Sequence, residues 1–161
     1  MDVFQEAEML RKVPFFGKLD PAKLKLLAFT SRALRFASGE NLMRAGEMAD
    51  SAYVILEGEV EILGETTAGE FVVAVQGRNA LIGEMGVIMN APRTATVRAK
   101  DAVRALRISG EVFLRLLTEN PDCALHVMQV LSTRLASGFR DMESLKEQLL
   151  EAQASSPGRA Q

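Results

Sequence analysis

Cysteine and histidine each occur only once in this chain of 161 residues. The single cysteine, Cys123, excludes an intramolecular disulfide, which favours a reducing compartment, and it excludes an iron–sulfur centre, which needs several thiolates. A cupin-type metal site needs a cluster of histidines, so His126 cannot form one alone, and we expect it at a surface or an interface. A haem sensor that uses Cys123 or His126 has little support. No metal site is therefore predicted.

Long apolar runs and large patches of one charge are also missing. No apolar run approaches the ~18 residues of a membrane-spanning helix, and the N-terminus does not resemble a secretory signal. Charged residues make up 25% of the chain and the net charge is −2, so we expect no binding of nucleic acid through a clustered basic surface. We predict a soluble, cytoplasmic protein with one sizeable core and no direct nucleic-acid or membrane partner.

The spacing of apolar residues changes along the chain and indicates its organisation. Near the N-terminus, Asp20 and Pro21 are suited to start a helix, and the stretch 14–17 is typical of a turn with two apolar anchors. Small polar residues at the C-terminus predict disorder. The expected segments are an N-terminal helical segment (1–30), a β-rich segment (31–109), a C-terminal helical segment (110–152) and a disordered tail (153–161).

The β-rich segment consists of short apolar runs separated by glycine-bearing turns. This pattern predicts an α+β protein with an antiparallel, jelly-roll-like β-roll between its helical segments. The expected strands cover residues 52–56, 60–63, 71–75, 94–98 and 103–108. The segment also contains scattered basic residues, which we expect on solvated strand faces. They are Arg32, Arg35, Arg98, Arg104 and Arg107.

The C-terminal segment is predicted to contain a short helix over 111–119 and, after Asn120 and Pro121, a long helix to about residue 152. Apolar residues recur along the long helix in alternating steps of four and three, a heptad pattern. Either the helix packs on its own β-roll, or residues 124–152 form a parallel homodimer. A β-roll is too short to cover the whole helix, which favours the second interpretation. The stripe is Ala124, Met128, Leu131, Leu135, Gly138, Met142, Leu145, Leu149 and Ala152.

Two short stretches carry the candidate chemistry. In the first, Gly83 and Gly86 allow close approach to the backbone, and a helical turn starting near Glu84 presents unpaired N–H groups to an anion. In the second, Arg93 opens a strand and supplies a permanently charged fork that suits a phosphate. Phosphate repels a carboxylate, so Glu84 is better suited to accept a hydrogen bond from a sugar hydroxyl. The combination predicts a nucleotide site.

These stretches resemble the phosphate-binding cassette of the cyclic-nucleotide-binding domain family, which includes the catabolite activator protein, protein kinase A regulatory subunits and cyclic-nucleotide-gated channels. The family pattern is matched by Gly83–Met85 and by Pro92–Val97. The acid and the arginine are nine positions apart (93 − 84 = 9), as in the kinase regulatory subunits. The resemblance covers about residues 10–140.

The resemblance implies a role for each matched residue. Glu84 should accept a hydrogen bond from the ribose 2′-hydroxyl, Arg93 should pair with the cyclic phosphate, and Thr94 should add a hydroxyl contact. Backbone amides should point at the phosphate or ribose from Gly83, Glu84, Met85 and Gly86. Positions that wall the pocket correspond to Met43, Ile62 and Ala74, and positions that cover the nucleotide as a lid correspond to Arg134 and Ser137.

These features predict a sensor of cAMP or cGMP, with no other cofactor, that relays ligand occupancy through its C-terminal helix to a dimer or a partner protein. The alternative is a ligand-independent structural or dimerisation module, in which Glu84 and Arg93 only brace a turn. An enzyme is not expected, because no nucleophile–base pair, metal set or paired carboxylates stand out. Nine residues follow Ala152 (161 − 152 = 9), too few for the DNA-binding domain of bacterial relatives, so direct control of transcription is not expected.

Overall fold

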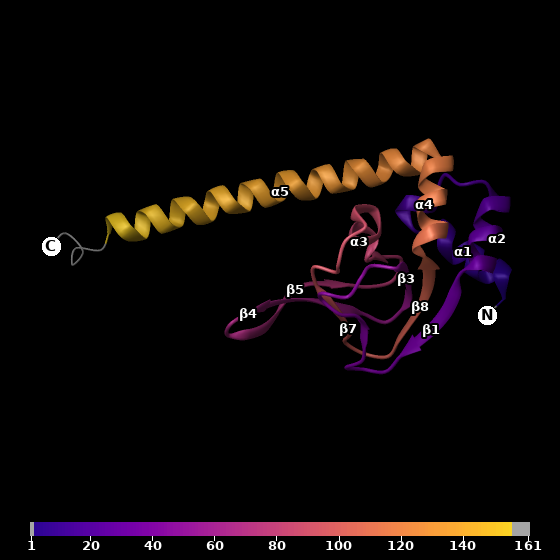
Figure 1. Ribbon diagram of the computed structural model, residues 1–161, viewed down its shortest axis with the longest axis horizontal. Helices are drawn as coiled ribbons and strands as arrows, with labels where there is room; N and C mark the ends of the chain where they lie inside the picture. Colours follow the sequence, from indigo (N-terminus) through magenta and orange to yellow (C-terminus); the bar gives the residue numbers. More distant parts are fainter. Residues whose placement is uncertain (1, 156–161) are drawn as a thin grey trace. The chain divides into compact units, whose positions relative to one another are not determined.

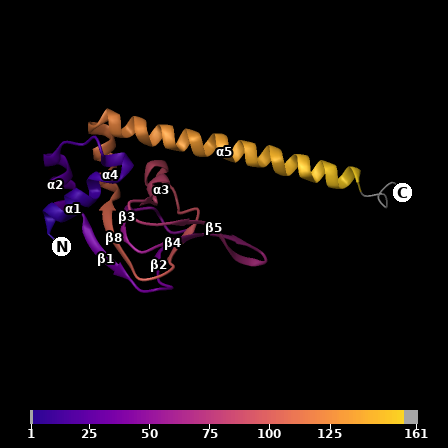
Figure 2. The same ribbon diagram turned by 180° about the vertical axis from the view of Figure 1, so that it is seen from behind.

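Two antiparallel four-stranded sheets form the centre of the fold (Figures 1 and 2). They belong to a computed structural model that describes residues 2–155. Helices precede and follow the strands, so the predicted α+β class with an antiparallel β-roll is confirmed. The first sheet has the order β1 (Arg32–Phe36), β8 (Val103–Ser109), β3 (Ser51–Glu57) and β6 (Leu81–Ile82). The second has the order β2 (Asn41–Met43), β7 (Thr96–Ala99), β4 (Val60–Thr66) and β5 (Gly69–Gln76).

Strand β3 contributes to two hydrophobic cores. Val54 and Leu56 belong to the core shared with the helices, whereas Tyr53 and Ile55 belong to the core between the two sheets. Successive side chains of a strand point to opposite faces, so a strand that is covered on both faces needs an uninterrupted apolar run. This explains why residues 52–56 are apolar without alternation, and every one of them is buried.

The N-terminal helices cover the first core. Asp2 and Gln5 form a reciprocal capping box at the start of the first helix, and Phe16 is fully buried in a short 3-10 turn where the sequence predicted an apolar anchor. Asp20 occupies the N-cap of the next helix as predicted, but its side chain makes no capping hydrogen bond. These elements are α1 (Val3–Arg11), η1 (Pro14–Phe16) and α2 (Pro21–Thr30).

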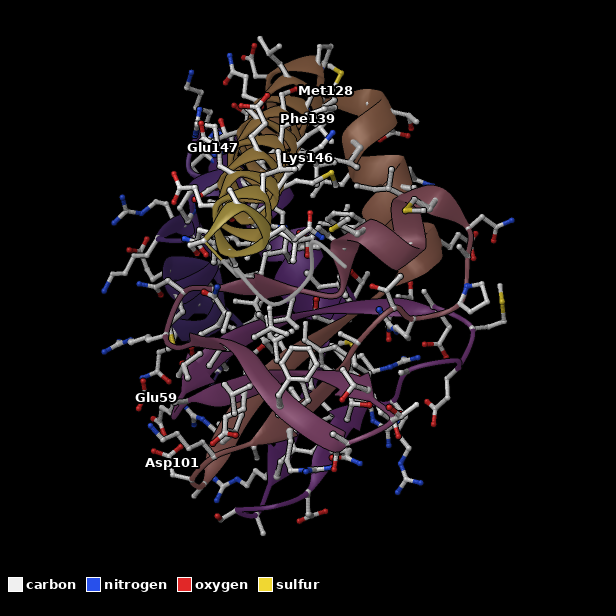
Figure 3. All side chains as sticks on the ribbon, turned by 90° about the vertical axis from the view of Figure 1, so that its left-hand side faces the viewer. Glu59, Asp101, Met128, Phe139, Lys146 and Glu147 are labelled. Carbon is white, nitrogen blue, oxygen red and sulfur yellow. The ribbon has the colours of Figure 1, made fainter. Side chains whose placement is uncertain are left out.

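The turn between β3 and β4 packs against the turn between β7 and β8. Gly58 has a φ of +84°, and a β-carbon there would overlap the carbonyl oxygen of Ala102. The backbone N–H of Glu59 donates to the Asp101 carboxylate at 2.8 Å, and Figure 3 shows these two residues at one end of the β-roll. Gly58 is therefore required both by its backbone conformation and by the close contact between the turns.

Two helices follow the last strand. In α4 (Gly110–Glu119), Ser109 caps the N-terminus by accepting a hydrogen bond from the Val112 N–H, and Phe113 is fully buried. Cys123 lies in the first turn of the next helix and is also buried, and its thiol donates to the carbonyl oxygen of Phe15 at 2.6 Å. Burial raises the pKa of Cys123 to about 11, so this thiol is a packing group and not a reactive one.

The long helix α5 (Pro121–Ala154) carries the boundary between two units of the chain, Met1–Cys123 and Ala124–Gln161. The helix continues two residues beyond the predicted end, because Gln153 and Ala154 are compatible with a helix. The prediction of a tail from residue 153 is therefore wrong for its first two residues, and residues 156–161 lie outside the described part of the chain. Met128 and Phe139 are labelled on α5 in Figure 3.

Candidate functional site

Gly83 places the start of α3 (Glu84–Met89) directly after β6. Its φ of +82° lies in the left-handed region, which only glycine adopts without strain. A β-carbon at Gly83 would also lie 2.5 Å from Nη1 of Arg93 and 2.7 Å from Cε of Met43. The glycine is thus needed for its backbone conformation and for the space that Arg93 and Met43 occupy.

Helix α3 packs closely onto the loop before β3. A β-carbon at Gly86 would lie 2.6 Å from Cβ of Ala49, so this face of the helix tolerates no side chain. Glu84, at the first position of α3, is only 4% exposed, whereas Met85 next to it is 43% exposed. Carboxylates are almost never fully buried unless they are paired, and the N–H groups of a helical first turn have no acceptor within the helix itself.

Arg93 is buried beneath the start of α3. Its Nη1 donates to the carbonyl oxygen of Gly83 at 2.8 Å, and its Nη2 donates to the carbonyl oxygen of Ser51 at 2.6 Å. The side chain is 5% exposed, and this burial lowers the pKa of Arg93, although a guanidinium keeps its proton in any protein environment. The backbone is held as well, because Arg93 exchanges hydrogen bonds with the 46–47 loop. A fixed positive charge therefore lies directly beside Gly83.

The position of Arg93 differs from the prediction in one respect. β7 begins at Thr96, so Arg93 and Thr94 precede the strand that they were predicted to open. The hydroxyl of Thr96 accepts a hydrogen bond from the Ala45 N–H at 3.0 Å, which joins the first residue of β7 to the loop that follows β2. Thr94 is exposed.

The three residues predicted to wall the pocket come together in one row of the second sheet. Met43 pairs with Val97, Val97 pairs with Ile62, and Ile62 pairs with Ala74. Paired residues of antiparallel strands share a face, and Met43, Val97 and Ile62 contribute to the core between the sheets. Met43 is adjacent to Gly83, so the row begins at the cassette. The other two predicted residues, Arg134 and Ser137, lie on α5 in the second unit.

Asp50 is a neighbour of the cassette that sequence reasoning missed. Its Oδ1 lies 3.9 Å from Nη2 of Arg93, and its Oδ2 lies 3.1 Å from Nη2 of Arg107 on β8. Partial burial acts to raise the pKa of Asp50, but a hydrogen bond from the Ser51 hydroxyl, with Arg107 and Arg93 nearby, brings it below its ordinary value. No short motif connects these residues, since they are brought together by three separate segments.

The strand arginines are only partly solvated. Arg98, Arg104 and Arg107 have side chains that are 34%, 21% and 30% exposed, and each pairs with a carboxylate at 3.1 Å. The prediction of solvated faces is therefore only partly correct for these three residues, and it is confirmed for Arg32 and Arg35, which are exposed. The difference arises because β1, which carries Arg32 and Arg35, has only β8 as a neighbour in its sheet, whereas β7 and β8 each lie between two strands.

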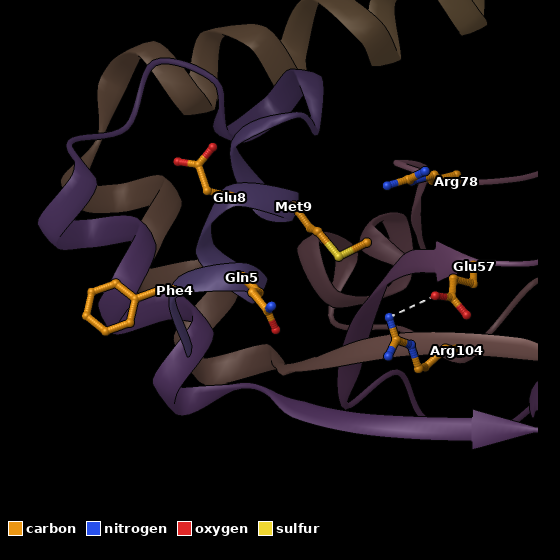
Figure 4. Close-up of a pocket in the computed structure, with 7 residues that line it drawn as sticks. All are labelled: Phe4, Gln5, Glu8, Met9, Glu57, Arg78 and Arg104. Carbon is orange, nitrogen blue, oxygen red and sulfur yellow. Dashed lines mark hydrogen bonds and ion pairs between the residues drawn. The ribbon is translucent and has the colours of Figure 1, made fainter. Parts of the chain in front are cut away.

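A separate open pocket of about 700 Å³ lies between α1 and the ends of β3 and β8 (Figure 4). It contains the ion pair between Arg104 and Glu57, and both signs of charge line it. None of the cassette residues takes part. The lining residues are Phe4, Gln5, Glu8, Met9, Glu57, Arg78 and Arg104.

The fold and the cassette agree with a known family. Residues 33–120 match the family model of the cyclic nucleotide-binding domain, which is more than half of the chain. The chain therefore belongs to the cyclic nucleotide-binding domain family, as the resemblance of the cassette predicted.

Individual relatives support this assignment. The chain is 31% identical over 115 residues to a cAMP-dependent protein kinase regulatory subunit of Mycosarcoma maydis, a match that covers 68% of this chain and 22% of the relative. The sensor domain of the transcriptional regulator DNR from Pseudomonas aeruginosa superimposes with a TM-score of 0.77 at 28% identity, covering 87% of this chain and 95% of that one. The regulatory subunit of a cAMP-independent protein kinase A from Trypanosoma brucei gives a TM-score of 0.62 at 26% identity, covering 80% and 53%.

The curated relatives are longer than the segment that this chain matches. The chain spans between a fifth and three fifths of the length of the curated relatives it matches, 22% of the fungal kinase subunit and 58% of a CRP-like cAMP-activated global transcriptional regulator of Mycobacterium tuberculosis.

Among residues 2–155, none of the helices has both the length and the apolar composition of a membrane span. In the same part of the chain, no group of three or more His, Cys, Asp or Glu side chains is placed to hold a metal ion.

Gly83→Ala is expected to lower the free energy of unfolding by about 1–3 kcal/mol through backbone strain, and by more through the contact with Arg93. Gly39→Ala is the matched control, because Gly39 has a φ of +88° and a β-carbon there would have no atom within 4 Å. Urea denaturation of both variants separates the two contributions. Equal losses of stability in the two variants would show that the space beside Arg93 is not constrained.

Proposed function

We propose that this chain binds a cyclic mononucleotide, cAMP or cGMP, and that Arg93 pairs with its cyclic phosphate. The observation that carries the proposal is the buried guanidinium held directly beside Gly83 and the first turn of α3. Taking a charge out of water is costly, and an anionic ligand at this position would compensate the cost. Arg93 is anchored through carbonyl oxygens, and its ion pair with Asp50 is long at 3.9 Å.

Glu84 completes the proposed site by accepting a hydrogen bond from the ribose 2′-hydroxyl. Its position at the start of α3, directly after Gly83, supports this role, because a carboxylate accepts a hydrogen bond from a hydroxyl and is repelled by the phosphate. The backbone amides of Gly83, Glu84, Met85 and Gly86 are proposed to face the phosphate or the ribose. The row that contains Met43, Ile62 and Ala74 would line the base or sugar. Thr94 is compatible with either cAMP or cGMP.

We further propose that α5 relays ligand occupancy and that residues 124–152 form a parallel homodimer. The apolar residues of the heptad stripe support it: Met128, Leu135, Met142, Leu145 and Leu149 are 56–67% exposed. With these residues at a and d positions, Asp141 falls at g and Lys146 at e, where opposite charges of two parallel helices meet. Arg134 and Ser137 remain the proposed lid residues. A change in the dimer or in an exposed face would inform a partner protein, in a cytoplasmic and non-catalytic role.

A ligand-independent structural module is the second candidate. Two observations favour it: Arg93 already has carbonyl partners without any ligand, and one structural neighbour is described as the regulatory subunit of a cAMP-independent kinase. In this case the cassette would only brace the junction between β6 and α3.

Calorimetric titration with cAMP, cGMP and cyclic di-GMP tests the proposal, and we expect heat from at least one of the mononucleotides. The 2′-deoxy analogue of the ligand that binds should bind about ten- to hundredfold more weakly, which is the effect of losing one hydrogen bond to a charged group. In Glu84→Ala the ordinary and the deoxy ligand should bind alike. No heat from any of the three compounds would favour the structural module, and a deoxy penalty that persists in Glu84→Ala would contradict the role of Glu84.

A further inference from the structure

Asp50 lies between two arginines at unequal distances. The pair with Arg107 is 3.1 Å long, and the pair with Arg93 is 3.9 Å long, at the limit of an ion pair. Each arginine approaches a different oxygen of the same carboxylate, Oδ2 for Arg107 and Oδ1 for Arg93. The carboxylate is thus shared unequally and is held mainly by β8.

Arg107 lies on the inner face of β8. Val103 and Ala105, four and two residues before it, belong to the core between the sheets, and Arg107 is paired in register with Tyr53, which belongs to the same core. Arg104 precedes Arg107 on the same strand but lies on the other face, where it pairs with Glu57 beside α1. Arg107 is therefore the β8 arginine that faces the cassette.

We propose that Arg107 is a positioning residue for the ligand site: by holding the Asp50 carboxylate, it leaves the Arg93 guanidinium available to an anionic ligand. The two arginines compete for one carboxylate. Without Arg107, the carboxylate of Asp50 would be free to pair more closely with Arg93, which would place a negative charge where the phosphate is proposed to bind. The side chain of Asp50 is 72% exposed, so water screens this competition and its effect is modest.

This inference rests on the proposed function, and a double-mutant cycle tests it with the nucleotide that gives heat in calorimetry. Arg107→Ala is expected to weaken binding by about two- to fivefold, the range for a solvent-exposed ion pair. Asp50→Asn should remove the competitor, so Arg107→Ala should have no further effect in that background. Arg107→Lys should retain most of the affinity, and Arg104→Ala is the matched control from the same strand, with binding unchanged.

Two results would overturn the inference. If Arg107→Ala weakens binding equally with and without Asp50→Asn, Arg107 attracts the ligand directly; if Arg107→Ala leaves binding unchanged, the competition is absent. A ligand-free measurement separates this inference from the proposed function. The guanidinium NMR resonances of Arg93 should differ between the wild-type protein and Arg107→Ala. They should be the same in Asp50→Asn and in the double variant. If no nucleotide binds the wild-type protein, the proposed function fails, and these resonances alone decide whether Asp50 exchanges partners.

Discussion

Arg93→Ala is expected to abolish the rise in melting temperature that cAMP or cGMP gives to the wild-type protein. A ligand at a hundred times its dissociation constant stabilises the folded state by about 2.7 kcal/mol, which is a rise of about 5–10 °C for a chain of this size. The substitution removes the only group proposed to carry a positive charge to the phosphate. The expected rise for the variant is therefore close to zero.

The same substitution also affects the unliganded protein. It leaves the carbonyl oxygens of Gly83 and Ser51 without the two hydrogen bonds that Arg93 provides, which we expect to cost about 2–4 kcal/mol of unfolding free energy. Arg93→Lys keeps the charge but not the fork and should retain part of the ligand response. Arg98→Ala, which removes a half-buried arginine of β7, should retain all of it. A folded Arg93→Ala protein with an undiminished thermal shift would contradict the assigned role.

Leu149→Lys is expected to convert the proposed dimer into a monomer. Leu149 is 61% exposed within one chain and occupies an a position of the heptad stripe. The substitution would therefore bury one lysine from each helix in the apolar contact between the two helices. Burying unpaired charges costs several kcal/mol, which corresponds to at least ~100-fold weaker association. Light scattering coupled to size-exclusion chromatography measures the mass directly, against 17.6 kDa for one chain.

Leu150→Lys provides a close control for this experiment. Leu150 is the next residue of α5, is 56% exposed and lies outside the stripe, so the same change of side chain should leave the dimer intact. Dissociation by both variants would indicate a general effect of charge on the helix. A wild-type protein that elutes with the mass of one chain at every concentration would refute the homodimer.

Most of the strands were predictable because their patterns are local. Residues 52–56 are an uninterrupted apolar run, residues 103–108 contain four apolar residues and two arginines, and β3 and β8 cover these stretches. The strands that were missed are β1, whose residues are mostly exposed, and β2 and β6, which have three and two residues. Such short strands form because neighbouring strands provide their hydrogen-bond partners. These partners are distant in the sequence, so the residues of the short strand alone do not predict the pairing.

The cassette itself was determined by the sequence. Gly83, Glu84 and Arg93 lie within a short stretch of chain, and the requirements for a positive φ, a carboxylate and a charged fork are properties of single residue types. A motif of this kind is visible before any tertiary contact is known, and it led directly to the family.

The surroundings of the cassette were decided only by the tertiary structure. Asp50, Arg93 and Arg107 belong to three segments, and whether their charges meet depends on the register between β3 and β8. In the same way, the register of β2, β7, β4 and β5 aligns Met43, Ile62 and Ala74 in one row. Register is set by backbone pairing between distant strands, and a shift of one residue would turn each of these side chains to the opposite face.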